Sequence, residues 1–342
     1  PPAPPHIATV YKSSAASDVY KRQELANHFF EGHSHYDRWM DGHPEVKERF
    51  YPMVTSKGQN TASRGATGAL QVWPMDVPRE LYHTDWVADR TINWIGSLAA
   101  EEPFFCWMSF PDPHHPWDVP SSELHRVRWQ DVPLPRLYRE QASAREALLE
   151  GKPRHWRGYY EGTLWSNLES PREFVPAAMT PDQVREINAM THIENELIDE
   201  ACQRVFDFLA ARGQLENTDI IFTTDHGELQ GDFGLLFKGP YHVDALMRLP
   251  LIWRPAATAN VQPAASAGVE PAEVTAPVGH LDLASTFCAI AGIEAPNYCE
   301  GTVLPLSDAQ AVEQGREFVL TEWDSEHGPI DMHLKSVFEQ SG

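Results

Sequence analysis

Apolar residues recur along this chain with two different spacings, and each spacing predicts an element. Three stretches show the three-to-four-residue spacing of a helix with one buried face: residues 80–100, 180–212 and 280–293. The second of them has clear ends. Thr180 can cap the helix, Pro181 suits its first turn, Gln183 completes a capping box, and Gly213 is a stop signal.

Short runs of almost continuous apolar residues lie between these helices, with many aromatic and β-branched side chains. We predict buried strands in residues 103–110, 218–224 and 249–255, and a last strand in residues 316–323. Strands that alternate with helices indicate an α/β fold, in which helices flank a mostly parallel central sheet.

The remaining stretches carry no regular period. Residues 24–71 are polar and rich in His, Gly and aromatic residues, which suggests long ordered loops, and residues 120–178 are predicted to be an insertion of loops and short helices. Residues 11–23, "YKSSAASDVYKRQ", fit neither period and resemble a non-native junction; a solvated surface loop is the alternative. We therefore expect residues 1–23 to be such a junction or a disordered segment.

Composition narrows the class of protein. Hydrophobic residues make up 42% of the 342, which excludes disorder as the main state. The formal net charge is 27 − 49 = −22, so a nucleic acid is not an expected partner, although a local cation can still attract a small anionic substrate. The four cysteines form no CxxC pair, which argues against a disulfide framework or a structural zinc site: Cys106, Cys202, Cys288 and Cys299. No apolar run approaches the length of about 20 residues that spans a bilayer, and no signal peptide is visible, so localisation stays open.

Ionisable side chains follow two of the predicted strands. Asp112, His114 and His115 come after the first strand, and Asp225 and His226 come after the second. Ligands of open α/β sheets collect at the carboxyl ends of strands, and an Asp–His pair can supply half of a divalent metal site. The residues alone leave a second interpretation open, in which the aspartate caps a turn and the histidine is hydrogen-bonded in the core.

Three ordered blocks resemble one known family. They are "FFCWMSFPDPHHPW", "FTTDHGE" and "KGPYHVDALMRLPLIW", and together with the long helix before the second block they cover most of residues 80–325. The chain is similar to the sulfatase family of the alkaline-phosphatase-like superfamily, which has a T-[ST]-D-[HN]-G-E segment, a following lysine and an S-[FY]-x-x-P-H-x-P segment.

The resemblance implies a role for four residues. Asp225 and His226 would be two ligands of one divalent cation, and Ca²⁺ is the ion most typical of sulfatases. Histidine is less usual than asparagine at the second of these positions, which leaves Mg²⁺ or Mn²⁺ open and favours phosphonate-ester relatives. Lys238 would contact a substrate oxygen, and His114 would protonate or stabilise the leaving oxygen. Cleavage of such an ester needs fixed positive charge and an acid of this kind.

Two of the family's motifs are not found in the 342 residues. No cysteine or serine stands in a C-x-P-x-R or S-x-P-x-R motif, whose first residue becomes the formylglycine nucleophile, and there is no Asp-Asp pair. We therefore expect a fragment, with a sulfatase-like α/β domain in residues 24–306 and the beginning of a truncated C-terminal α+β subdomain in residues 307–342. His33 and His35 have ligand-like spacing, but their neighbours offer no further ligands.

Three functions follow as hypotheses. The first is metal-dependent hydrolysis of a sulfate monoester, with a small anionic ester as substrate. The second keeps the fold but cleaves phosphonate or phosphate esters, and the third is a catalytically inactive binding module. The sequence does not disclose the organic group of the substrate or the oligomeric state, and we expect the 342-residue chain itself to show little or no turnover.

Overall fold

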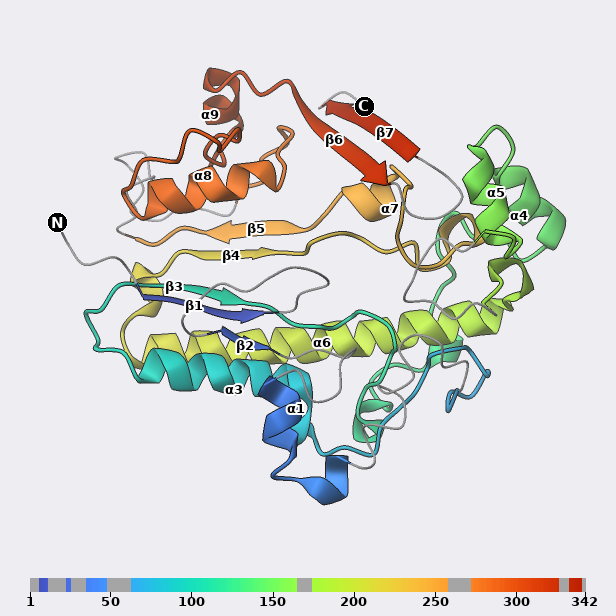
Figure 1. The fold of residues 1–342 in the computed structure, drawn as a ribbon, viewed down its shortest axis with the longest axis horizontal. Helices are drawn as coiled ribbons and strands as arrows, with labels where there is room; N and C mark the ends of the chain where they lie inside the picture. The colour runs from blue at the N-terminus through green and yellow to red at the C-terminus, as the bar shows by residue number, and fades with distance from the viewer. Residues whose placement is uncertain are drawn as a thin grey trace. The chain divides into compact units, whose positions relative to one another are not determined.

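The computed structural model describes residues 6–11, 23–25, 35–47, 63–164, 174–257, 272–325 and 332–339 (Figure 1). The chain divides into two compact units. Unit 1 comprises Pro1–Arg212 and Glu228–Gly239, and unit 2 comprises Gly213–Gly227 and Pro240–Gly342.

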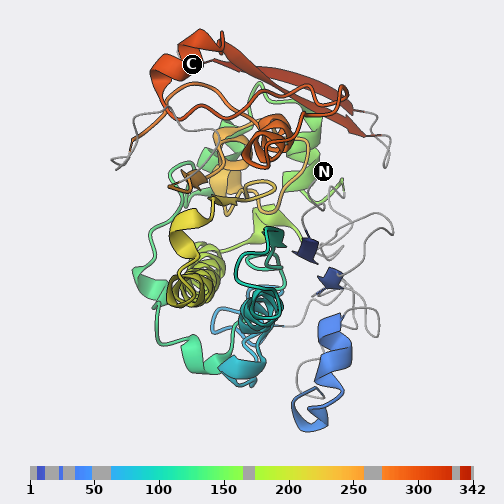
Figure 2. The same ribbon diagram turned by 90° about the vertical axis from the view of Figure 1, so that its left-hand side faces the viewer.

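Unit 1 contains a parallel sheet and two long helices. Its strands are β1 (His6–Tyr11), β2 (Gln23–Leu25) and β3 (Phe104–Met108), in the order β2–β1–β3, and both pairings are parallel. Helix α3 (His83–Gly96) leads into β3 and lies beside α6 (Pro181–Ala211); Figure 2 shows the two helices nearly end-on. The short helix α1 (His35–Met40) completes the N-terminal part, with Tyr36 and Met40 buried.

Helix α6 begins and ends where the sequence predicts. The backbone N–H of Gln183 donates to Thr180 Oγ1 at 3.2 Å, and the N–H of Thr180 donates to Gln183 Oε1 at 3.0 Å, which completes the capping box. Gly213 follows the helix with φ +68°, a conformation that glycine adopts without strain. The predicted apolar face is buried except at Phe208, which is half-buried; its buried residues are Val184, Ile187, Ile193, Leu197, Ala201 and Val205.

The segment between β3 and α6 is made of loops and short helices, as the sequence predicts. The 3₁₀ helices are η1 (Arg79–Leu81), which precedes α3, and η2 (Ser121–Glu123), η3 (Trp129–Asp131) and η4 (Pro176–Ala178); the α-helices are α4 (Ala142–Leu148) and α5 (Arg154–Tyr160). Arg145 is buried at its centre and donates to the carbonyl oxygens of Arg139 and Glu140 at 2.9 and 2.8 Å. The insertion is therefore ordered by a buried guanidinium that bonds to the backbone.

Unit 2 contains two antiparallel strand pairs. Strand β4 (Ile220–Thr223) pairs with β5 (Leu251–Arg254), and β6 (Phe318–Ser325) pairs with β7 (Met332–Glu339). Helix α8 (Leu281–Ile290) confirms the helix predicted there, and its Asp282 accepts from Arg316 at 2.8 Å. The other short elements are η5 (Leu215–Asn217), α7 (Asp244–Met247) and α9 (Asp308–Glu313), while η6 (Asp232–Gly234) belongs to unit 1.

The structure corrects the prediction of fully buried strands. Trp107 of β3 and Phe222 of β4 are each 43% exposed, and Ile252 of β5 is 64% exposed. The reason is that each of these strands has one pairing neighbour among the described strands, and so lies at an edge of its sheet. The described strands form three small sheets, of which only β2–β1–β3 is parallel.

The structure also bears on the expected junction, on the cysteines and on the expectation that no segment spans a membrane. Residues 12–22 of the expected junction lie outside the described residues, while Tyr11 and Gln23 at its ends belong to strands. All four cysteines are free thiols. Among the described residues, no helix combines the length and apolar character needed to cross a bilayer.

Candidate active site

The loop after β3 brings His114 to Lys238 within unit 1. Lys238 Nζ lies 2.6 Å from His114 Nε2, although the two residues are 124 positions apart. Both side chains are half-buried, so each keeps an exposed edge. The structure thus joins the two residues to which the family resemblance gives a catalytic role.

The hydrogen bonds of His114 indicate which ring nitrogen carries the proton. An ammonium group has only donors, so His114 Nε2 is the acceptor for Lys238. The other nitrogen, Nδ1, lies 2.5 Å from the carbonyl oxygen of His115 and donates to it. We therefore assign a neutral imidazole with its proton on Nδ1 and with Nε2 facing the lysine.

An aromatic stack supports this pair. Phe237, next to Lys238, is 1% exposed and adopts φ +67°; its ring centroid lies 4.3 Å from that of His115 and 6.2 Å from that of Trp117. His115 stacks in turn on His114 at 4.2 Å. The buried ring of His115, which lies in the loop after β3, therefore packs between His114 and Phe237.

Asp225 and His226 follow β4 in unit 2 and form a local pair. His226 Nε2 lies 3.5 Å from Asp225 Oδ2, and the backbone N–H of His226 donates to Asp225 Oδ1 at 3.0 Å. His226 Nδ1 lies 2.8 Å from the carbonyl oxygen of Gly227 and donates to it, which leaves the Nε2 lone pair on the side of the carboxylate.

Gly227 is required at its position by the packing of the backbone. Its N–H donates to the carbonyl oxygen of Leu246 at 3.0 Å. A Cβ atom there would lie 1.9 Å from the carbonyl oxygen of Ala245, so no other residue fits. This close approach fixes the backbone that carries Asp225 and His226.

The Asp225–His226 pair fits the divalent cation that the family implies. Neighbouring ligands of such a cation, bound at about 2.0–2.4 Å, lie roughly 3–3.5 Å apart, and the 3.5 Å separation of the two ligand atoms agrees. The backbone carbonyl that holds the opposite ring nitrogen is the partner that metal-bound histidines commonly have. Asp225 is 73% exposed at its side chain, which leaves room for further ligands.

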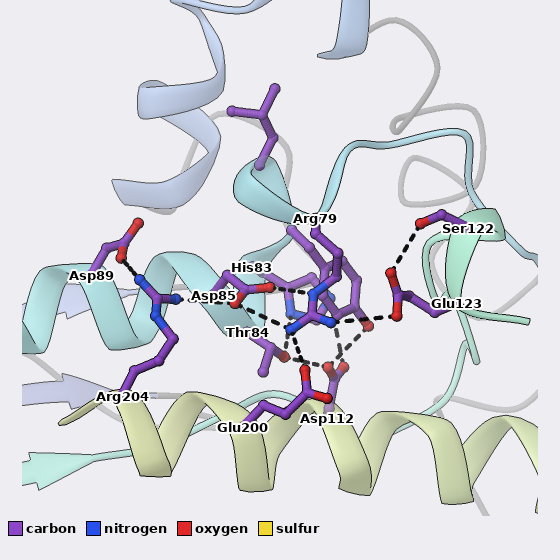
Figure 3. Close-up of polar contacts among 12 residues, drawn as sticks. Arg79, His83, Thr84, Asp85, Asp89, Asp112, Ser122, Glu123, Glu200 and Arg204 are labelled. Atoms are coloured by element: carbon purple, nitrogen blue, oxygen red, sulfur yellow. Dashed lines mark hydrogen bonds and ion pairs between the residues drawn. The ribbon is translucent and has the colours of Figure 1, made fainter. Parts of the chain in front are cut away.

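A second ionisable cluster lies in unit 1, and sequence reasoning found only one of its members. His83 Nε2 lies 3.5 Å from Asp112 Oδ1 and 3.5 Å from Asp118 Oδ1, and all three side chains are buried. Figure 3 shows His83 and Asp112 of this cluster. Three such atoms within 4.8 Å of one another could hold a metal ion. His83 opens α3, whereas the two aspartates flank His114 in the loop after β3; no local motif joins them.

The charges of this cluster change the pKa values of its members. Burial lowers the pKa of His83, but the charges of Asp112 and Asp118 outweigh that effect and raise the pKa above its usual value. Burial raises the pKa of Glu194 well above its usual value, and the same two aspartates raise it further. The cluster therefore attracts positive charge, as protons or as a cation.

Arginines beside the cluster join α3 to α6, as Figure 3 shows. Arg79 Nε donates to Asp85 at 2.6 Å and its terminal nitrogen donates to Glu200 at 3.0 Å, while Arg204 donates to Asp85 at 3.0 Å. These ion pairs are partly exposed and therefore add little to stability. Their role is to align the two helices that supply His83 and Glu194.

No observation supports His33 and His35 as metal ligands. His33 lies outside the described residues, and His35 is an exposed residue at the start of α1. The structure thus brings His114 and Lys238 together in unit 1, and Asp225 and His226 together in unit 2.

Comparisons with known proteins agree on one family. A family model described as Sulfatase matches residues 8–293. An uncharacterized sulfatase of Escherichia coli, YidJ, is 27% identical over 281 residues, which are 82% of this chain and 48% of that protein. An arylsulfatase of Clostridium perfringens is 26% identical over 174 residues, 50% of this chain and 32% of that protein.

A solved structure shares the fold. The phosphonate monoester hydrolase of Agrobacterium radiobacter matches with a TM-score of 0.65 and 21% identity, over 88% of this chain and 56% of that one. The chain therefore spans 32% to 56% of the length of these three relatives. Because the family model covers residues 8–293, more than half of the sequence, the chain belongs to the sulfatase family.

Proposed function

We propose that the intact protein hydrolyses a sulfate monoester with the help of a divalent cation. The observation that carries this proposal is the contact between Lys238 and His114 at 2.6 Å, in a chain that the sulfatase family model matches. The arylsulfatase relative supports the same reaction class. The substrate is a small anionic ester, and the acidic surface of the chain does not suit a nucleic acid.

Lys238 and His114 have complementary tasks in this reaction. The ammonium of Lys238 places a fixed positive charge where an ester oxygen becomes more negative, which stabilises the transition state. His114 Nε2 is the ring atom that faces this charge, and the carbonyl oxygen of His115 holds the other nitrogen. To act as the acid, Nε2 would first take up a proton from solvent and then pass it to the leaving oxygen, while the bond from Nδ1 keeps the ring oriented.

Asp225 and His226 are the proposed ligands of the cation. Ca²⁺ is the most typical ion of the family, and the histidine at the second position leaves Mg²⁺ or Mn²⁺ open. A bound cation would polarise an ester oxygen. The proposed nucleophile is a formylglycine, and its C/S-x-P-x-R motif has no match in the 342 residues.

Two other functions are alternatives to this one. Hydrolysis of phosphonate or phosphate esters is favoured by His226, which stands where sulfatases more often have asparagine. An inactive binding module is the third function, and it would gain support if the complete reading frame supplied no nucleophile motif. The same proposal includes a mostly parallel central sheet, a sulfatase-like domain in residues 24–306 and a C-terminal subdomain that begins in residues 307–342.

The test begins with the DNA that encodes the chain, read as one continuous molecule through and upstream of codons 1–30. An open frame that supplies an acidic pair and a C/S-x-P-x-R motif supports an enzyme. The protein encoded by that frame is then assayed on an aryl sulfate and on a phosphonate monoester. We expect faster turnover of the sulfate, and a loss of about 10²-fold or more in kcat for His114→Ala and Lys238→Ala.

The controls separate the three functions. Lys152→Ala removes a lysine of unit 1 that lies over the ring of Trp156 and should leave kcat unchanged. Preference for the phosphonate would support the second function. A frame that starts just before residue 11, or a full protein that turns over neither ester, would support the binding module.

A further inference from the structure

We propose that His83, Asp112, Asp118 and Glu194 form a buried site for a divalent cation of the first transition row, with Zn²⁺ as the best fit. The residues are distinct from the Asp225–His226 pair, and all four belong to unit 1. The role of this cation would be structural.

The distances within the cluster suit metal ligands better than hydrogen bonds. His83 Nε2 lies 3.5 Å from one oxygen of each aspartate, which is longer than the 2.7–3.2 Å of a good N–H···O bond. A tetrahedral cation bound at about 2.0–2.2 Å holds its ligand atoms about 3.3–3.6 Å apart. One imidazole nitrogen that lies at equal distances from two carboxylate oxygens therefore has the geometry of a shared ion.

Hydroxyl groups hold these ligands in place from outside. Asp112 Oδ2 accepts from Tyr82 Oη at 2.9 Å and from Thr84 Oγ1 at 2.5 Å, so the carboxylate is fixed with Oδ1 toward His83. Thr84 Oγ1 also lies 3.4 Å from His83 Nδ1, the nitrogen on the far side of the ring. Outer partners that fix the carboxylate and the imidazole in this way are typical of metal sites.

Glu194 supplies the independent observation that points to a ligand. It lies on α6, is 0% exposed, and neither of its carboxyl oxygens has a hydrogen-bond partner of normal geometry among the described residues. Its strongest interactions with other charged groups are with Asp112 and Asp118, which places the carboxyl beside them. The backbone N–H of Asp118 interacts with this carboxyl, but a buried charged carboxyl is still unfavourable unless a proton or a cation neutralises it, and a cation would serve all three acidic groups.

The donor set decides the class of ion. One imidazole nitrogen with carboxylate oxygens suits Zn²⁺ and Mn²⁺, whereas Ca²⁺ prefers six to eight oxygen ligands. The four side chains are buried, so an ion with few ligands and short bonds fits the site. These points favour Zn²⁺.

An ion here would stabilise the loop that carries His114. Asp112 and Asp118 lie on either side of His114, and the other two ligands come from α3 and α6. One cation would therefore cross-link both helices to the loop without touching the substrate. The alternative state, with a protonated His83 and a protonated Glu194, would leave the cluster metal-free, and the experiment must distinguish it.

The experiment uses the double variant Asp225→Ala/His226→Ala, so that any bound ion is not held by that pair. After dialysis against Zn²⁺ and then against metal-free buffer, elemental analysis should find one Zn²⁺ per chain. Adding Asp118→Asn or His83→Gln should abolish this retention, whereas Asp89→Asn should keep it. Asp89 is the matched control, because it is a carboxylate of the same helix that pairs with Arg204 instead.

Thermal unfolding and spectroscopy complete the test where a variant fails to fold. In the double variant, free Zn²⁺ at about 100 times its Kd should raise Tm by about 5 °C. With Mn²⁺ bound to the double variant, pulsed electron spin resonance should detect one directly coordinated histidine nitrogen. A double variant that retains no Zn²⁺ and shows no Tm rise with Zn²⁺ or Mn²⁺ overturns the proposal. So does retention that Asp118→Asn leaves unchanged, or bound Mn²⁺ without a nitrogen ligand.

Discussion

Phe237 is a buried residue in a backbone conformation that normally suits glycine, and this leads to an unusual order of stability among its variants. With φ +67°, an L-residue at this position is strained by about 1–2 kcal/mol. Its ring is 1% exposed and packs at 4.3 Å from His115 and at 5.0 Å from Phe174, centroid to centroid. The packing therefore offsets the strain, and we expect the two effects to separate in two substitutions.

Truncation of the ring should cost about 3–5 kcal/mol of unfolding free energy in Phe237→Ala, because the cavity is lined by aromatic groups. Phe237→Gly loses the same contacts but also loses the backbone strain, at an entropic cost of about 0.5–1 kcal/mol. We expect the glycine variant to be more stable than the alanine variant by about 0.5–1 kcal/mol. Leu236 is the matched control, since it is equally buried but has no positive φ. There, alanine should be more stable than glycine by about 0.5–1 kcal/mol.

The assay is urea unfolding of the four variants, followed by far-ultraviolet circular dichroism and by tryptophan fluorescence. The midpoints give the order within each pair, and trimethylamine N-oxide can be added equally to all four if the truncations unfold the chain in buffer. Finding Phe237→Ala more stable than Phe237→Gly, with the same order at Leu236, would refute the reasoning. The left-handed turn before Lys238 would then not be a source of strain.

Three further predictions concern other parts of the chain. Burial raises the pKa of Cys106 to about 12, so at pH 8 iodoacetamide should label this thiol roughly 10³-fold more slowly than a free thiol. The labelling rate, followed by mass spectrometry, should rise tenfold for each pH unit. Labelling at the rate of a free thiol would contradict this prediction. The carboxylate of Glu186 accepts from the backbone N–H groups of Ala66 and Thr67 at 2.5 and 2.9 Å. In Glu186→Gln an amide NH₂ would oppose one of these N–H groups, so urea unfolding should show a loss of about 2–3 kcal/mol of unfolding free energy. A loss under 0.5 kcal/mol would contradict this prediction. Thr180→Ala should cost about 1 kcal/mol by the same measurement, since it removes half of the capping box, and an unchanged midpoint would mean that the end of the helix frays in the wild type.

The long helix shows what sequence could predict well. Both ends of α6 are encoded within a few residues, by Thr180 and Gln183 at the start and by Gly213 at the end, and its apolar face repeats over many turns. Local signals of this kind do not depend on the rest of the fold. The burial of the strands was predicted wrongly because exposure depends on which strands pair beside them, and pairing is not local.

Some residues of the candidate site could also be named from the sequence, whereas others could not. His114, Lys238, Asp225 and His226 could be named because each stands in a motif that the family resemblance covers, and the contact between His114 and Lys238 joins two such motifs. His83, Asp118 and Glu194 could not be named, because they come from α3, from a loop and from α6, and no spacing along the chain relates them. Asp112 was singled out for its place after a strand, but its partners needed the structure.

The length of α6 restricts which insertions and deletions this chain can accept during evolution. The helix presents Glu186, Glu194 and Glu200 to three different sets of partners along its 31 residues. One inserted or deleted residue would rotate everything after it by about 100° and shift it by about 1.5 Å, so that all contacts beyond that point would be lost together. We expect related chains to vary freely in the length of residues 120–178 and to keep the number of residues in this helix constant.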